Sequence, residues 1–146
     1  MVLSEDVVKW FSFNMNLNGY HNLIEAFTVE NKYPATNIFS AGRQQIFSGN
    51  AKLNTVFHLP KNFDIQATFI YLAPDIIPQG KIGQRFSLDL GIKTTIQKGK
   101  GELFLNATDL ANTMFVKRQI QGKDFSFTAT DYYETQVIRL GYSYKF

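Results

Sequence analysis

FSLDLGIKTTIQ, residues 86–97, alternates between apolar and polar side chains over nearly its whole length. In an extended chain, successive side chains point to opposite faces. Phe86, Leu88 and Leu90 therefore share one face, and Ser87 and Asp89 share the other. This period of two predicts a β-strand with one apolar face and one polar face.

The same alternation recurs in five other stretches, at roughly 8–25, 45–59, 62–73, 102–117 and 130–146. Residues 60–62 and 98–101 form short links between them, whereas residues 26–44, 74–83 and 118–129 form longer ones. The links thus alternate in length along the chain. We predict an all-β fold, an antiparallel up-and-down meander of about six long strands, with the short turns and both termini at one end.

The polar face is composed mostly of Ser, Asn, Thr, Gln and Gly, although an exposed sheet of a soluble protein is usually rich in Lys and Glu. The stretches of about 12 to 16 residues also exceed the 9–11 residues with which a tilted strand crosses a bilayer. We predict that the apolar face contacts lipid and that the polar face lines a water-filled lumen. The residues predicted to face this lumen are Ser48, Asn50, Lys52, Asn54, Asp64, Gln66, Ser87, Asp89, Lys93, Gln97, Glu102 and Arg139.

A bilayer offers no hydrogen-bond partners to backbone groups, so transmembrane strands occur in closed barrels. About six strands are too few to close around such a lumen. We therefore expect residues 1–146 to be one segment, an arc of a larger transmembrane β-barrel without a plug domain. Its edge strands then require partners, either the remaining strands of a parent protein or another copy of the chain.

The chain ends on the alternating stretch VIRLGYSYKF, residues 137–146. Tyr142, Tyr144 and Phe146 would lie on the lipid side near the headgroups, where aromatic side chains gather. This ending looks like the signal read by the outer-membrane assembly machinery. The expected location is the outer membrane of a Gram-negative cell, with any export signal on a segment outside residues 1–146.

Little in the sequence points to catalysis. The chain has no cysteine, which excludes disulfides, thiolate zinc sites and cysteine nucleophiles. His21 and His58 lie on different predicted strands, and lumen carboxylates such as Asp64 and Glu102 have Lys93 available for ordinary ion pairs. The net charge of +3 is scattered, without a basic block that indicates nucleic-acid binding. We predict no enzymatic activity, no cofactor and no metal site.

The sequence resembles the C-terminal part of a TonB-dependent receptor-like outer membrane protein, of the outer membrane protein β-barrel family. The resemblance covers residues 9–22, 47–82, 86–113 and 137–146, and includes ATDLANTMF at 107–115, where Asp109, Leu110 and Asn112 end an alternating strand. It implies a barrel of about 22 strands that imports large solutes. This chain departs from such receptors because it shows neither a plug nor a coupling box.

A soluble lipocalin-like barrel that binds an apolar ligand is the alternative. It would show the same alternation, with the apolar face turned inward and the polar face turned to solvent. The two hypotheses differ in which face is buried.

Overall fold

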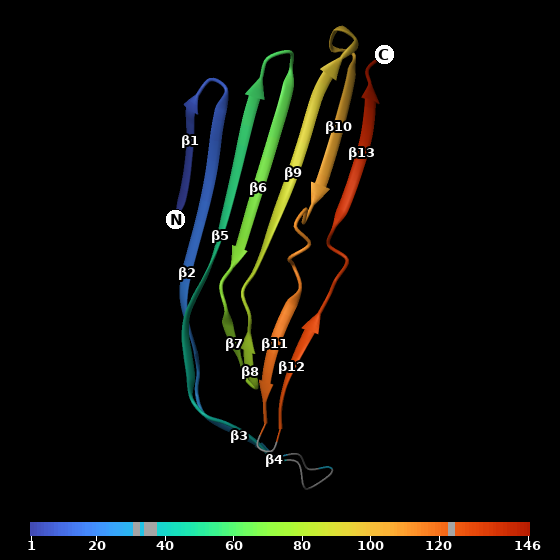
Figure 1. The fold of residues 1–146 in the computed structure, drawn as a ribbon. Coiled ribbons are helices and arrows are strands. Elements are labelled where there is room, and N and C mark those ends of the chain that lie inside the picture. Colours follow the sequence, from blue (N-terminus) through green and yellow to red (C-terminus); the bar gives the residue numbers. More distant parts are fainter. Residues whose placement is uncertain (31–32, 34–37, 123–124) are drawn as a thin grey trace.

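The computed structural model describes residues 1–30, 33, 38–122 and 125–146, so Asn31, Pro34, Asn37 and Asp124 of the predicted links lie outside the described residues. The fold is all-β and antiparallel, and a seven-stranded sheet forms its main body (Figure 1). In spatial order its strands are β1 (Val2–Val8), β2 (Phe11–Ile24), β5 (Gln44–Leu59), β6 (Phe63–Leu72), β9 (Arg85–Ile96), β10 (Gly101–Thr108) and β13 (Val137–Tyr144). The predicted up-and-down meander is confirmed.

Tight turns join the long strands at one end of this sheet (Figure 1). Lys61 and Asn62 adopt positive φ angles between β5 and β6. A short 3-10 turn, Gln97–Gly99, joins β9 to β10, and Gly99 at φ 92° supplies the left-handed conformation that glycine adopts without strain. The two predicted short links are therefore true turns.

The three predicted long links are not plain loops, because each contains further strands at the opposite end of the sheet (Figure 1). The added strands are β3 (Phe27–Glu30), β4 (Ile38–Ala41), β7 (Asp75–Ile77), β8 (Gly80–Ile82), β11 (Val116–Gln121) and β12 (Ser126–Asp131). β3 pairs with β4, and β7, β8, β11 and β12 form a four-stranded sheet. Most of the long strands thus continue, after a break, into these extensions.

The structure also contains a strand that the sequence pattern did not predict. β1 pairs with β2 through residues 2–8, and residues 9–10 form the turn between them. The amino group of Met1 donates to the carbonyl oxygen of Leu17 at 2.7 Å, in the middle of β2. The prediction that both termini lie at the short-turn end is therefore wrong for the N-terminus. Glu5 caused the error, because it occupies an apolar-face position opposite Phe13 and interrupts the alternation.

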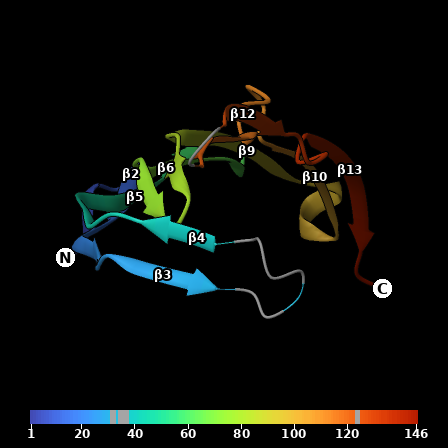
Figure 2. The ribbon, with the colours of Figure 1, turned by 90° about the horizontal axis from the view of Figure 1, so that it is seen from below.

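The main sheet is a curved, open single layer whose edges are β1 and β13 (Figure 2). Among the described residues, Ile76 and Val116 are the only buried hydrophobic residues, whereas Phe47 and Leu140 are 85% and 72% exposed. A lipocalin-like barrel needs a closed sheet around an apolar interior. The structure does not support that alternative.

Strand register keeps the two faces separate across the sheet. One apolar row runs from Phe11 through Phe57, Ile65, Ile92 and Leu105 to Leu140, each directly opposite the next. A slip of one residue would move every side chain of a strand to the opposite face. The alternation of apolar and polar residues therefore specifies the register strongly.

Gly49 and Gly19 lie directly opposite each other on β5 and β2. They provide a matched test of how closely the backbones of these two strands pack. A Cβ at Gly49 would lie 2.5 Å from the Asn18 carbonyl oxygen, whereas a Cβ at Gly19 would have no neighbour within 4 Å. We expect Gly49→Ala to lower the free energy of unfolding by about 1–3 kcal/mol through overpacking. Gly19→Ala should change it by no more than about 0.5 kcal/mol. Urea titration in detergent micelles measures both, and equal effects would contradict this packing.

Candidate functional site: the polar face of the sheet

The polar face carries most of the polar and ionisable side chains that could bind a solute or take part in chemistry. Register places eleven of the twelve residues predicted to face a lumen together on this face, all except Gln97. Asn54, Thr68 and Asp89 form one row across β5, β6 and β9, and Thr68 Oγ1 donates to Asn54 Oδ1 at 2.9 Å. That this face encloses water stays a prediction, and the face also carries a few apolar side chains, such as Phe104 opposite Lys93 and Val56 opposite Gln66.

Gln97 does not belong to this surface. It lies in the turn after β9 with φ 53°, so the alternation of the strand no longer sets its direction. Its Oε1 accepts a hydrogen bond from the hydroxyl of Tyr142 at 2.7 Å, and Tyr142 lies on the apolar face opposite Leu103. The prediction for Gln97 is wrong because the period of two was extended one residue past the end of the strand.

Ionisable side chains cross the polar face near the short-turn end. His58 Nδ1 lies 2.8 Å from Asp64 Oδ1, and Lys93 Nζ lies 3.0 Å from Glu102 Oε2. Asp64 and Lys93 are directly opposite each other, and Lys93 reaches diagonally to Glu102, so the two pairs form one band over four strands. We call these four residues the rim row. Its side chains are about half exposed, so each pair contributes only about 0–1 kcal/mol. Ordinary ion pairing, as predicted, describes the Lys93–Glu102 contact.

The most buried polar group lies at the point where β10 ends. Asp109 is 1% exposed and has φ 46°, which stops the strand. Its carboxylate accepts hydrogen bonds from Thr135 Oγ1 at 2.6 Å and from the backbone N–H groups of Thr113 at 3.0 Å and Met114 at 3.2 Å. Its own N–H donates to Asp89 Oδ1 at 2.8 Å. Asp109 thus ties β9, the β10–β11 link and the start of β13 together.

The sequence pattern identified Asp109 as the end of a strand but did not predict its partners. Thr135 is 26 residues away along the chain, and Thr113 has a second bond, from its Oγ1 to the Phe86 carbonyl oxygen at 2.6 Å. These partners converge only because β9, β10 and β13 are neighbours. No periodicity in the sequence contains that information.

A second polar cluster attaches the β7 extension to the sheet. Asp75 accepts hydrogen bonds from the Tyr20 hydroxyl at 2.7 Å and from Asn22 Nδ2 at 2.9 Å. These bonds, that of Asn22 first, hold the pKa of the Asp75 carboxyl below its ordinary value of 3.8, although partial burial opposes them. Ser48, opposite Tyr20 on β5, is buried, and its hydroxyl has no hydrogen-bond partner among the described residues. Asp75 was not among the predicted site residues.

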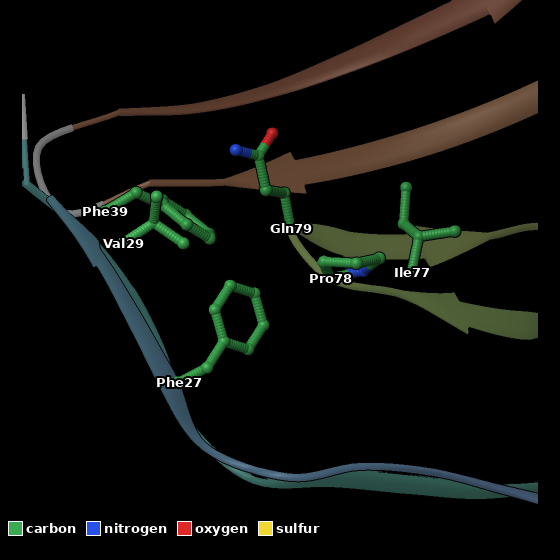
Figure 3. Close-up of a pocket in the computed structure, with 6 residues that line it drawn as sticks. All are labelled: Phe27, Val29, Phe39, Ile77, Pro78 and Gln79. Atoms are coloured by element: carbon green, nitrogen blue, oxygen red, sulfur yellow. The ribbon is translucent and has the colours of Figure 1, made fainter. Parts of the chain in front are cut away.

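The long-loop end also holds an apolar cavity of about 530 Å³. Phe27, Val29 and Phe39 of the β3–β4 hairpin lie on one side of it, and residues 77–79 of the β7–β8 turn lie on the other (Figure 3). The side chain of Gln79 supplies the polar group of the lining. The cavity therefore contains no titratable side chain that could act as an acid or a base.

A cluster of three or more His, Cys, Asp or Glu residues that could hold a metal ion is absent from the described parts of the chain. Likewise, no helix in those parts has the length and apolar character needed to cross a bilayer. The two histidines are also separated, because His21 packs beside Phe47 at 4.7 Å between ring centroids while His58 belongs to the rim row.

The profile of the outer membrane protein β-barrel family matches residues 1–144. The chain belongs to this family. Comparison with curated proteins and with solved structures gave no significant match. As a member of the outer membrane protein β-barrel family, it is a barrel-type protein of the outer membrane, with a membrane lipid environment.

For a protein of the outer membrane β-barrel family, the placement of the aromatic residues is informative. Tyr142 and Tyr144 are exposed near the short-turn end of β13, and Phe146 packs edge-on against Tyr144 at 5.4 Å. Trp10, in the β1–β2 turn at the same end, stacks on Phe57 at 6.4 Å. Aromatic side chains gather at both interfaces of such barrels. That the C-terminal aromatics lie at such an interface stays a prediction.

The Asp109 cluster can be tested against an exposed acidic residue. Asp109→Ala leaves the N–H groups of Thr113 and Met114 without their acceptor, so we expect a loss of about 1.5–3 kcal/mol in the free energy of unfolding. Glu134→Ala, at an exposed position near Thr135, should change it by less than about 0.5 kcal/mol. Urea unfolding of the protein in micelles gives both values. A neutral Asp109→Ala would show that the cluster does not hold the strands together.

The Asp75 cluster should depend on pH. Because the folded pKa lies below 3.8, the carboxylate stabilises the attachment of β7 above about pH 3.8 and loses this effect as the pH falls through the lower folded value. Amide hydrogen exchange at residues 76–77 should be slower in the native protein than in Asp75→Asn at pH 6. This difference should disappear below the folded pKa. Tyr20→Phe keeps the carboxylate and the bond from Asn22, so it should keep part of the slowing of amide exchange at residues 76–77.

Proposed function

We propose that this chain forms part of the wall and lumen of a TonB-dependent receptor-like transporter that takes up a large solute across the outer membrane. The observation that carries the proposal is the separation of the two faces over seven strands. One face holds exposed Phe, Leu and Ile side chains, and the other holds hydrogen-bonded Asn, Ser, Thr and charged side chains. Family membership supports the barrel, and the sequence resemblance supports the finer assignment.

The dimensions of the strands support a transmembrane position. β6 has 10 residues and β9 has 12, which suits a tilted strand that needs about 9–11 residues to cross the hydrocarbon layer. The short turns lie at one end and the β3–β4, β7–β8 and β11–β12 extensions lie at the other (Figure 1). Barrels of this kind have short periplasmic turns and longer outer loops. We therefore place the rim row near the periplasm and the extensions outside the cell.

Crowding on the polar face supports its position on the inner side of the arc. On the polar face, Ser48 is buried opposite Tyr20 of the Asp75 cluster and Ser87 is buried beside Asp89, whereas Phe47, the neighbour of Ser48 on the other face, is largely exposed. Side chains converge on the concave side of a curved sheet and diverge on its convex side. A lumen lined in this way is polar and carries both signs of charge, which suits a large hydrophilic solute.

We propose that the role is conduction and not catalysis. On the polar face, ionisable groups form ion pairs with each other, as Lys93 does with Glu102. Such pairing is typical of a lining surface. In the same proposal, the outer-membrane assembly machinery recognises Tyr142, Tyr144 and Phe146 at the end of β13. All three side chains are exposed, and Tyr142 and Tyr144 share the apolar face of β13, where that machinery would have access to them.

Two neighbouring residues test the orientation of the faces. The protein has no cysteine, so Asn54→Cys and Leu53→Cys each introduce a unique thiol on opposite faces of β5. In dilauroylphosphatidylcholine vesicles, we expect a water-soluble maleimide to label Asn54→Cys and to leave Leu53→Cys largely unlabelled. Both should react fully after unfolding in SDS, which controls for intrinsic reactivity. Labelling of Leu53→Cys with protection of Asn54→Cys would overturn the proposed function.

A further inference from the structure

The short-turn end of the main sheet carries five lysine residues that lie far apart in the sequence. They occupy the β1–β2, β5–β6 and β9–β10 turns and the position directly after β13, as Lys9, Lys61, Lys98, Lys100 and Lys145. These turns and the C-terminus lie at the same end of the sheet (Figure 1). All five lysines are exposed, and residues 9–10, 60–62, 97–100 and 145–146 include no Asp or Glu. We call these five residues the lysine belt.

Backbone hydrogen bonds align the belt across the sheet. In each turn a carbonyl oxygen accepts an N–H from the next segment in spatial order: Trp10 from His58 at 2.8 Å, Asn62 from Thr95 at 3.1 Å and Lys100 from Lys145 at 2.8 Å. The turns are thereby tied to one another and are not independent loops. The lysines therefore follow the curved end of the whole sheet, although they are scattered along the sequence.

The belt holds the excess positive charge of the protein. None of the ion pairs among the described residues includes a belt lysine. The carboxylates of the rim row, at the same end, already pair with His58 and Lys93. At the long-loop end, the two arginines with ion-pair partners are Arg43, which lies 3.7 Å from Glu25, and Arg118, which lies 3.2 Å from Asp131. The five lysines exceed the net charge of +3, so the rest of the chain is slightly acidic.

Aromatic side chains accompany the belt on the apolar face. Trp10 is 55% exposed and stacks on Phe57, a member of the apolar row. Tyr142, on the same face of β13, is 52% exposed. Trp and Tyr gather where hydrocarbon meets the headgroups, and a lysine stem follows apolar surface while its ammonium group reaches outward. This arrangement puts the ammonium groups of the belt at the depth of headgroup phosphates.

We propose that the lysine belt binds the headgroups of anionic phospholipids in the leaflet that meets the short-turn end. The inference rests on the transmembrane position of the sheet in the proposed function, but not on transport of a solute. Lysines near a membrane surface attract anionic lipids, whereas zwitterionic lipids carry no net charge. A soluble acidic protein would cover a compact patch. A layer of phosphates, in contrast, reaches lysines that are spread over every turn from β1 to β13.

Trp10 is the sole tryptophan and adjoins Lys9, so its fluorescence reports the lipid beside the belt. The full-length protein is inserted into equimolar phosphatidylcholine–phosphatidylglycerol vesicles in which one of the two lipids carries brominated chains, because bromine quenches tryptophan on contact. We expect phosphatidylglycerol to associate with the Trp10 region roughly two- to fivefold more strongly than phosphatidylcholine. The preference should fall towards one in about 1 M salt, which screens exposed charges.

Substitutions of the lysines nearest to Trp10 test the source of this preference. Lys9→Gln/Lys61→Gln should remove most of it, and Lys9→Arg/Lys61→Arg, which keeps the charge, should retain it. Lys81→Gln/Lys117→Gln is the matched control, because it removes the same charge from β8 and β11 at the other end of the molecule. This control should keep the native preference. A preference that survives Lys9→Gln/Lys61→Gln, or that the arginine or control variant abolishes, would overturn the proposal.

A relocated tryptophan tests whether the belt extends across the sheet. In Trp10→Phe/Tyr142→Trp protein, the sole tryptophan lies near the end of β13. We expect the same preference for phosphatidylglycerol there. Added Lys100→Gln/Lys145→Gln should remove it, whereas added Lys9→Gln/Lys61→Gln should not. A preference found at Trp10 alone contradicts a belt that binds lipid along its whole length.

The quenching also separates this inference from the function on which it rests. Equal association of both lipids with the Trp10 region refutes lipid binding by the belt alone, because the short-turn end then still lies at the membrane. If neither brominated lipid quenches Trp10, this end does not reach the bilayer. That result refutes the transmembrane position as well.

Discussion

The structure depends on the need to satisfy every backbone hydrogen bond in a single layer of sheet. With Ile76 and Val116 as the only buried hydrophobic residues described, the main sheet has no dry core to stabilise it. Its pairings instead run in long, mostly uninterrupted ladders, such as the one between β2 and β5 that joins residues 11–24 to residues 44–57. In hydrocarbon, such ladders have no competitor, because lipid offers neither donors nor acceptors. The same constraint makes the open edges of β1 and β13 incomplete.

The ladders also explain why polar chemistry gathers at a few positions. Along regular strands, the polar side chains meet only their cross-strand neighbours, as in the rim row. Where a strand stops, its backbone groups lose their ladder partners and side chains replace them. Asp109 does this at the end of β10, and Asp75 does it at the start of β7, where its Oδ1 also accepts the N–H of Ile76. The two most connected carboxylates therefore mark the breaks between the sheet and its extensions.

The faces of the strands could be predicted from the sequence, and several local features could not. The alternation placed Asn54, Asp89 and Arg139 on one face correctly, because the period of two is a local property of the extended chain. It failed at Gln97, where a positive φ ends the strand, and at β1, where Glu5 occupies an apolar-face position. It also described the extensions as loops, since their strands of three to six residues are too short to show a clear period.

By itself, the sequence determined that this protein is a meander with one apolar face and one polar face, since side chains in a strand alternate in direction from one residue to the next. Only the tertiary structure decided that the sheet has seven strands and that its two edges run the same way. It also decided that Asp109 meets Thr113 and Thr135. The physical reason is that strand pairing and buried hydrogen bonds join residues far apart in the chain, and no local pattern records which distant partner satisfies a given group.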